Sequence, residues 1–246
     1  MIERQIDIQT KDGRSTTFIC HPERDGPHPV ILFFMDAPAI REELRDMARR
    51  FASVGYYVML PNLYYRKGVM ELGPLPPPSA DDPARQRMME LMYSLTIDLV
   101  MDDAEAMIAF SDEDEAAAAG PIGCVGYCMS GQFSINAAAR FPDRVNAAAS
   151  IYGTFLVTDD KDSPHLVAHD ADAELYFGCA ETDRWAPMET VEALSQAMAG
   201  CANPTEVELY PGVEHGFAFP QRAAYNKDAA ERHWERLFAL FRRRLS

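Results

Sequence analysis

The chain has 246 residues, of which 48% are apolar, so it can bury one large hydrophobic core. Its formal net charge is −15, which argues against a general nucleic-acid-binding role, since phosphate contacts need a basic surface. It has neither a charged-then-apolar leader nor an apolar run near the roughly 20 residues of a membrane helix, so we expect a cytoplasmic protein without membrane contact.

The first half of the chain alternates predicted strands and helices. The predicted elements are strands over residues 3–9, 16–21, 30–35 and 57–60, a helix over 41–54, and a helical stretch from Met88 through Leu99 to an acidic run at 112–115. Between them lies a long loop rich in proline and glycine, residues 61–83. Loops of this length are usually functional, so we expect it to border the active site and to bring Tyr64 and Arg66 towards it.

The segment that follows the apolar strand 122–125 is the most informative part of the sequence. It reads Gly126-Tyr127-Cys128-Met129-Ser130-Gly131 and opens an alanine-rich helical pattern over 132–140. A strand-to-helix turn with small residues on both sides of a nucleophile is a nucleophile elbow. The N-terminus of the following helix favours a thiolate at Cys128. A small buried cysteine in a glycine-rich turn is the alternative interpretation.

Candidate partners for Cys128 follow in the order acid, then histidine. Asp183 comes just past the predicted strand 173–178, where catalytic groups collect in open α/β sheets, and Glu181 competes with it for the acidic role. His215 lies between glycines in the loop after the predicted strand 206–210. A last amphipathic helix ends near Leu245. This alternation predicts a single α/β domain over residues 1–246, with a mostly parallel central sheet and helices on both faces.

Four motifs carry a resemblance to a known family: Gly126-Tyr127-Cys128, the segment 61–66, Asp183 with Pro187 four residues later, and His215-Gly216-Phe217. With them the chain resembles the dienelactone hydrolase (carboxymethylenebutenolidase-like) family of the α/β-hydrolase superfamily, from near the N-terminus to the His215 loop. The resemblance implies an α/β-hydrolase fold and a catalytic triad of Cys128, Asp183 and His215.

The resemblance also assigns residues around the triad. Asp36 stands where the family usually has a glutamate that contacts the resting nucleophile, and the backbone N–H groups of Met129 and Ala37 would form the oxyanion hole. Arg87 matches the first of two arginines that hold a substrate carboxylate, whereas the second position is Phe219. The phenylalanine makes that side of the pocket apolar. Further candidate substrate contacts are Tyr64 and Trp185, of which Trp185 lines the pocket or caps the core.

The expected activity is hydrolysis of a small lactone or carboxylic ester through an acyl-cysteine intermediate, by an esterase that needs no cofactor and no metal and is a monomer or homodimer. His165 and His169 lack a third ligand at metal-site spacing. Two alternatives stay open. One is a catalytically degenerate hydrolase-fold protein that binds a small carboxylate. The other is a thiol redox protein that uses Cys128 with Cys124, although the odd count of five cysteines indicates reduced thiols.

Overall fold

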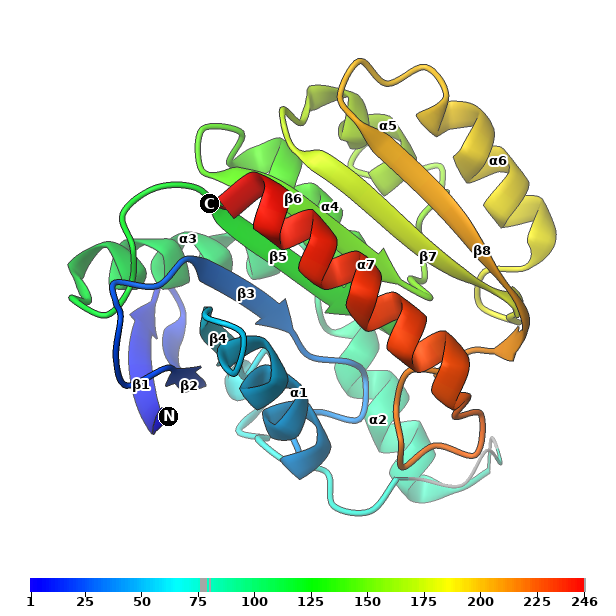
Figure 1. Cartoon of the computed structure of the whole chain (residues 1–246). Helices are drawn as coiled ribbons and strands as arrows, with labels where there is room; N and C mark the ends of the chain where they lie inside the picture. The colour runs from blue at the N-terminus through cyan, green and yellow to red at the C-terminus, as the bar shows by residue number, and fades with distance from the viewer. Residues whose placement is uncertain (76–78, 80, 246) are drawn as a thin grey trace. The chain divides into compact units, whose positions relative to one another are not determined.

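The computed structural model describes residues 1–75, 79 and 81–245. The chain divides into two compact units, Met1–Ala119 and Gly120–Ser246 (Figure 1). Each unit contains strands and helices of its own, and each is described separately below. The interpretation of residues 1–246 as a single domain stays a prediction.

The first unit contains a four-stranded mixed sheet. Its strands are β1 (Ile2–Thr10), β2 (Gly13–His21), β3 (Val30–Phe34) and β4 (Tyr57–Pro61), in the spatial order β1-β2-β4-β3. The β1–β2 and β2–β4 pairs are antiparallel and the β3–β4 pair is parallel. The predicted hairpin at Asp12-Gly13 is confirmed, with Thr10 opposite Gly13. Gly13 has a φ of +145°, which glycine adopts without steric cost.

Helices cover both faces of this sheet. The helical segments of this unit are α1 (Glu42–Ala52), the short 3-10 turn η1 (Tyr65–Lys67), α2 (Pro83–Tyr93) and α3 (Ile97–Glu113), of which α1 and α3 cover the sheet. The guanidinium of Arg49 on α1 lies 5.6 Å over the Phe18 ring, whereas the adjacent Thr17 donates to Met107 Sδ on α3 at 3.4 Å. Neighbouring residues of a strand point to opposite faces, so α1 and α3 lie on opposite sides.

The helical stretch predicted from Met88 to the acidic run is two helices, not one. Thr96 begins the second of them, because its side chain accepts the Leu99 N–H at 3.3 Å and so caps α3. The break falls between Tyr93 and Ile97.

Part of the predicted loop 61–83 is tied to α3. Both nitrogens at the end of Arg66 lie 2.8 Å from the Asp103 carboxylate, and Arg66 Nε donates to Asp12 at 2.8 Å. The Tyr65 hydroxyl also donates to Asp103 at 2.8 Å. These bonds hold Arg66 within the first unit. Positions 76–78 and 80 of the predicted loop lie outside the described residues.

The second unit contains a parallel four-stranded sheet. Its strands are β5 (Ile122–Tyr127), β6 (Val145–Ile151), β7 (Glu174–Thr182) and β8 (Thr205–Glu214), which pair in that order. The helical segments are η2 (Cys128–Ser130), α4 (Gly131–Arg140), α5 (Pro164–Val167), η3 (Ala168–Asp170), α6 (Met188–Met198) and α7 (Lys227–Leu245). The parallel arrangement predicted from the alternating pattern is confirmed.

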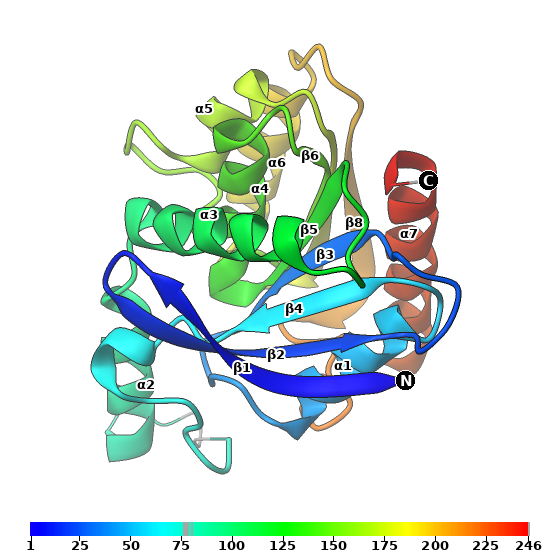
Figure 2. The same cartoon turned by 90° about the vertical axis from the view of Figure 1, so that its left-hand side faces the viewer.

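Two helices cover opposite faces of this sheet, as Figure 2 shows for α4 and α7. A Cβ at Gly123 on β5 would lie 2.7 Å from the Phe241 ring on α7, so α7 packs closely against this position. On the other face, a Cβ at Gly131, the first residue of α4, would lie 2.3 Å from Ser150 Oγ on β6. Small residues therefore let both helices approach the strands closely.

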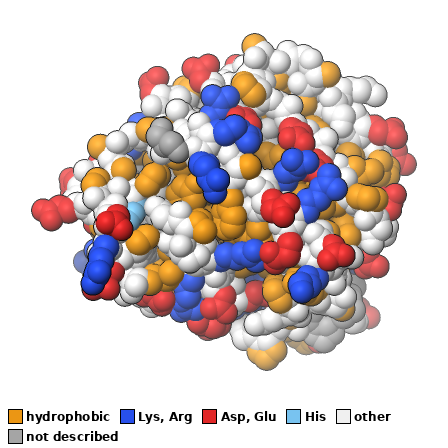
Figure 3. Space-filling view, in the orientation of Figure 1, with side chains coloured by type: hydrophobic (Ala, Val, Ile, Leu, Met, Phe, Trp, Pro, Cys, Tyr) orange, Lys and Arg blue, Asp and Glu red, His pale blue; other side chains and the backbone are white. Residues whose placement is uncertain are grey.

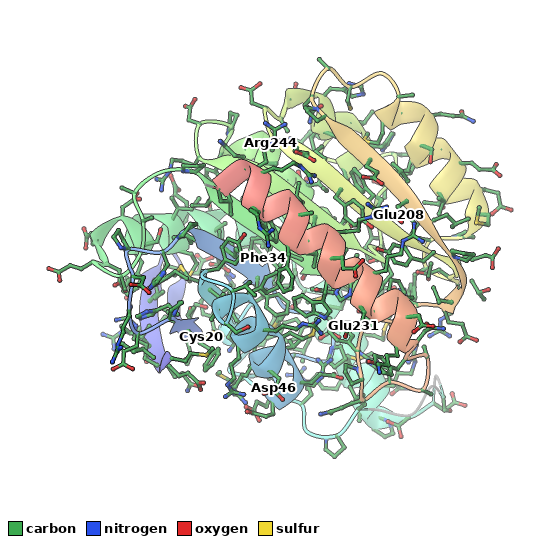
Figure 4. The ribbon with its side chains drawn as sticks, viewed as in Figure 1. Cys20, Phe34, Asp46, Glu208, Glu231 and Arg244 are labelled. Atoms are coloured by element: carbon green, nitrogen blue, oxygen red, sulfur yellow. The ribbon has the colours of Figure 1, made fainter. Side chains whose placement is uncertain are left out.

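Ion pairs connect α7 to β7 and β8. Arg236 Nε donates to Glu208 on β8 at 2.8 Å, and Arg244 Nε donates to Glu174 on β7 at 2.8 Å. Figure 4 labels Glu208 beside α7 and Arg244 near the end of that helix. Basic and acidic side chains are intermingled on this face of the molecule (Figure 3). Among the described residues, no helix combines the length and apolar content needed to cross a membrane.

Candidate active site

Cys128 sits at a sharp turn between β5 and α4. Its φ is +55°, a left-handed conformation that side-chain-bearing residues adopt rarely. A Cβ at Gly126 would lie 1.9 Å from the Ser130 carbonyl oxygen, so this position requires glycine. The Thr154 N–H donates to the Cys128 carbonyl at 2.9 Å and holds the turn. The predicted strand–turn–helix geometry is confirmed, and it presents a partly exposed thiol at the carboxyl end of the sheet.

Asp183 and His215 meet because β7 and β8 are parallel neighbours. Thr182 and Glu214 are opposite each other in the sheet, so the next residue of each strand lies at the same edge. Asp183 Oδ2 is 2.7 Å from His215 Nδ1. The other carboxylate oxygen accepts the Trp185 N–H at 2.8 Å, which fixes the carboxylate. The Asp183 side chain is 1% exposed and the imidazole is 21% exposed.

Glu181, the alternative acid, points elsewhere. It is exposed, and its carboxylate accepts the Gly212 N–H at 2.7 Å. The carboxylate bonded to His215 is therefore that of Asp183.

The surroundings of His215 favour its protonated form. Burial lowers the pKa of His215, but the electrostatic interaction with Cys128 and the hydrogen bond that His215 donates to Asp183 raise it by more, to about 10. Both partners therefore favour the imidazolium form of His215.

The predicted oxyanion-hole residues lie in different units. Met129 is the central residue of η2 and is buried. Ala37 follows β3 in the first unit, and its carbonyl accepts the Tyr64 hydroxyl at 3.0 Å. Tyr64 is thereby fixed against this turn, with 1% of its surface exposed. The roles of the Met129 and Ala37 N–H groups, and of Tyr64 towards a substrate, stay predictions.

Asp36 is fully buried and forms an ion pair within the first unit. Arg41 Nη1 and Nη2 lie 2.6 and 3.2 Å from its two oxygens, and Arg41 also donates to Glu43 at 2.7 Å. A bidentate pair of this kind fixes the position of the carboxylate. Its predicted contact with Cys128 stays a prediction.

The remaining predicted substrate contacts differ in exposure. Arg87 is exposed on α2, 3.3 Å from Glu90, and Trp185 is half-buried with the Arg184 guanidinium 5.1 Å over its ring. Phe219 is fully buried, with its ring 5.2 Å from that of Tyr127. The structure thus places Phe219 in the core of the second unit. The substrate roles of Arg87, Trp185 and Phe219 stay predictions.

Cys124, the candidate resolving thiol, lies in β5 and is fully buried. Burial raises its pKa far above the ordinary range, which disfavours the reactive thiolate. The side chains of His165 and His169, which are four residues apart, contact different neighbours. His165 Nδ1 is 2.7 Å from Ser163 Oγ, and His169 Nδ1 is 3.6 Å from Cys201 Sγ. Within the described ranges, no group of three or more His, Cys, Asp or Glu residues forms a metal site.

One neighbour of His215 was not predicted from the sequence. Tyr152 follows β6, and its ring centroid lies 5.0 Å from that of the imidazole. The strand before it, β6, is rich in alanine and was not predicted either. A strand signal there would have placed Tyr152 at the carboxyl edge of the sheet, beside the other site residues.

A nucleophile turn after one strand of a parallel sheet, with an acid and a histidine after two neighbouring strands, defines the α/β-hydrolase class. Residues 16–245 match the model of the dienelactone hydrolase family, and the chain belongs to this family of hydrolases. It is 27% identical over 235 residues to the carboxymethylenebutenolidase of Pseudomonas putida, over 94% of this chain and 92% of that protein.

Two further similarities agree with this assignment. A Methylorubrum extorquens protein whose given name proposes carboxymethylenebutenolidase activity is 27% identical over 246 residues, covering 98% of this chain and 81% of its own length. A crystal structure from Klebsiella pneumoniae subsp. pneumoniae, given the provisional name dienelactone hydrolase, has a TM-score of 0.85 at 24% identity and covers 98% of both chains. The solved structure shows the fold.

Proposed function

We propose that this protein hydrolyses a small lactone or carboxylic ester through a covalent acyl-cysteine intermediate, with Cys128 as nucleophile, His215 as acid and base, and Asp183 as the residue that orients the imidazole. The 2.7 Å bond between Asp183 and His215 carries the proposal. The left-handed turn at Cys128 and the raised pKa of His215, to which Cys128 contributes, support it.

The nucleophile is activated by charge. An imidazolium beside Cys128 stabilises the thiolate, which is the form that attacks a carbonyl carbon. Asp183 accepts the Nδ1–H, which leaves Nε2 as the nitrogen that exchanges protons with the reacting groups.

The acyl-transfer step follows from this arrangement. Attack of the thiolate converts the carbonyl into an oxyanion, which the Met129 N–H and a second N–H from the turn at Ala37 would bind. When the intermediate collapses, the alkoxide or enolate leaves and takes the proton from His215 Nε2. His215, now neutral, takes a proton from water, and the resulting hydroxide hydrolyses the thioester.

The substrate class follows from the nucleophile. Thiolate is itself a good leaving group, so it displaces stable leaving groups such as enolates far better than amines. A lactone that opens to an enol suits this preference. Arg87 offers one cation for a substrate carboxylate, while Phe219 supplies none.

The test compares hydrolysis of a dienelactone and of p-nitrophenyl acetate by wild-type protein, Cys128→Ala and Cys201→Ala. Cys201 is a partly exposed thiol in the loop after α6, so its replacement controls for general thiol reactivity. We expect turnover of at least one substrate that is lost in Cys128→Ala and kept in Cys201→Ala. Mass spectrometry of a rapidly quenched reaction should find the acyl group on the peptide that contains Cys128.

Full activity of Cys128→Ala would refute the proposed nucleophile. Absence of turnover, together with saturable binding of a small carboxylate to the wild-type protein, would favour the degenerate hydrolase-fold alternative.

A further inference from the structure

Tyr152 has an unusual backbone conformation for a large side chain. Its φ is +36°, in the sparsely populated left-handed region, and its N–H donates to the Gly178 carbonyl on β7 at 2.6 Å. Only 1% of the residue is exposed. An outlier of this kind at a bulky residue persists only where the surrounding structure imposes it, and such outliers cluster at functional sites.

The Tyr152 ring packs against the imidazole of His215. Its centroid is 5.0 Å from the His215 ring at an interplanar angle of 61°, an edge-to-face contact. It is also 5.3 Å from Phe217 and 5.9 Å from Phe219, both on the loop that carries His215. The ring of Tyr127, the residue before Cys128, is 5.8 Å from that of Tyr152.

The hydrogen bond to Asp183 alone does not fix the imidazole. A second hydrogen bond joins the imidazole to Cys128, but the two bonds still allow the ring to rotate about the line between their partners. A ring packed against the imidazole at 5.0 Å blocks this movement.

We infer that Tyr152 is a positioning residue, whose buried ring holds the His215 imidazole in the orientation in which Nδ1 meets Asp183 and Nε2 faces Cys128. The inference rests on the proposed function and adds to it a residue that touches neither the substrate nor the reacting atoms.

Two charged or titratable groups of the second unit act directly on His215, namely Cys128 from η2 and Asp183 from the loop after β7. His233 on α7 lies beside Tyr127. Its Nδ1–H donates to the Ala230 carbonyl, so its Nε2 accepts the hydrogen bond of the Tyr127 hydroxyl at 3.0 Å. That hydrogen bond holds Tyr127, which in turn packs against Tyr152.

The test measures alkylation of Cys128 by iodoacetamide between pH 6.5 and pH 10, with the modified peptide identified by mass spectrometry. This reaction needs a thiolate but no substrate. In Tyr152→Leu we expect the rate at pH 6.5 to fall about tenfold, which corresponds to one pH unit less stabilisation of the imidazolium–thiolate pair. At pH 10 a thiol ionises without help, so there the rate should stay within about twofold of wild type. Tyr152→Phe, which keeps the ring, should match wild type within about threefold at both pH values.

Phe133→Leu serves as the matched control, because it removes a buried ring from α4 in the same unit. It should leave the pH dependence unchanged. An unaltered pH dependence in Tyr152→Leu, or an equal loss at pH 6.5 in Phe133→Leu, would overturn the inference. A tenfold lower alkylation rate at pH 6.5 in Tyr152→Phe would also overturn the inference, because the effect would then belong to the hydroxyl and not to the ring. This result can be obtained even if the leucine variant does not fold. Ester hydrolysis that survives in Cys128→Ala would instead defeat the proposed function.

Discussion

Replacing Asp183 by asparagine tests the candidate triad most directly. The side chain is 1% exposed and its Oδ2 lies 2.7 Å from His215 Nδ1, so an asparagine fits the same space. Its amide oxygen can still accept the Trp185 N–H, which leaves the amide –NH₂ facing Nδ1. Nδ1 must then accept a hydrogen bond, so the proton moves to Nε2, where it can no longer receive one from the nucleophile or from water.

The size of the decrease in kcat distinguishes the loss of one hydrogen bond from a change of the His215 tautomer. A hydrogen bond to a charged group contributes about 1.5–3 kcal/mol, which alone would lower the rate roughly 10- to 150-fold. The wrong tautomer costs far more, and the same change in serine-protease triads lowers kcat about 10⁴-fold. We therefore expect Asp183→Asn to lower kcat about 10⁴-fold, or about 5 kcal/mol of transition-state stabilisation.

The assay is steady-state hydrolysis of p-nitrophenyl acetate across pH, with Glu181→Gln as the control. Glu181 is the neighbouring exposed carboxylate, bonded to the Gly212 N–H, and its neutralisation should change kcat less than about twofold. More than a tenth of wild-type activity in Asp183→Asn, or an equal loss in Glu181→Gln, would refute the assignment of Asp183.

Three other measurements test the elbow, the imidazolium and the substrate preference. In Gly126→Ala the new Cβ would meet the Ser130 carbonyl oxygen at 1.9 Å, a backbone clash that no rotamer relieves, so the free energy of unfolding should fall by about 3 kcal/mol; an unchanged urea midpoint would contradict this. The pKa of His215 is raised to about 10, so its stabilising contribution is complete below the unfolded-state pKa of about 6.5 and disappears as the pH rises through 10. The stability difference between wild type and His215→Gln, from urea unfolding at several pH values, should shrink over that window, and a constant difference would be incompatible. Arg87 is exposed, so Arg87→Met should raise KM for a dienelactone only about tenfold and leave KM for p-nitrophenyl acetate unchanged, and parallel changes for both substrates would exclude a role in carboxylate selection.

Much of the fold could be predicted because local pattern and local structure agree. The apolar run at 30–35 became β3, the Asp12-Gly13 turn became a hairpin, and the glycines around Cys128 became the elbow. The order of Asp183 and His215 after two strands was also readable, since the carboxyl ends of neighbouring parallel strands meet at one edge.

β6 was not predicted because its sequence is rich in alanine. Val145–Ile151 contains three consecutive alanines, and alanine has a low preference for strands. These positions are small because α4 and α7 pack on either side of the sheet, which is a tertiary requirement that no local window contains. With the strand hidden, Tyr152 could not be placed at the edge of the sheet beside His215.

The predicted end of the strand before His215 was also wrong. β8 continues to Glu214, although Pro211-Gly212 reads as a loop. Proline is tolerated at sheet edges, and the register shift between Ala180 and Thr182 of the partner strand accommodates the irregularity. The sequence could not reveal the bidentate pairing of Asp36 with Arg41 either, because no spacing rule predicts which cation will hold a buried carboxylate.

The burial of Phe219 limits how this enzyme could be re-engineered. A guanidinium at this fully buried position would lie among the rings of Tyr127 and Tyr152, with the loss of their packing and the desolvation of a charge as its first consequences. Phe219→Arg would therefore act on folding before it acted on selectivity. We therefore expect a second cation at this position to require compensating changes in the aromatic residues around it before it could alter substrate preference.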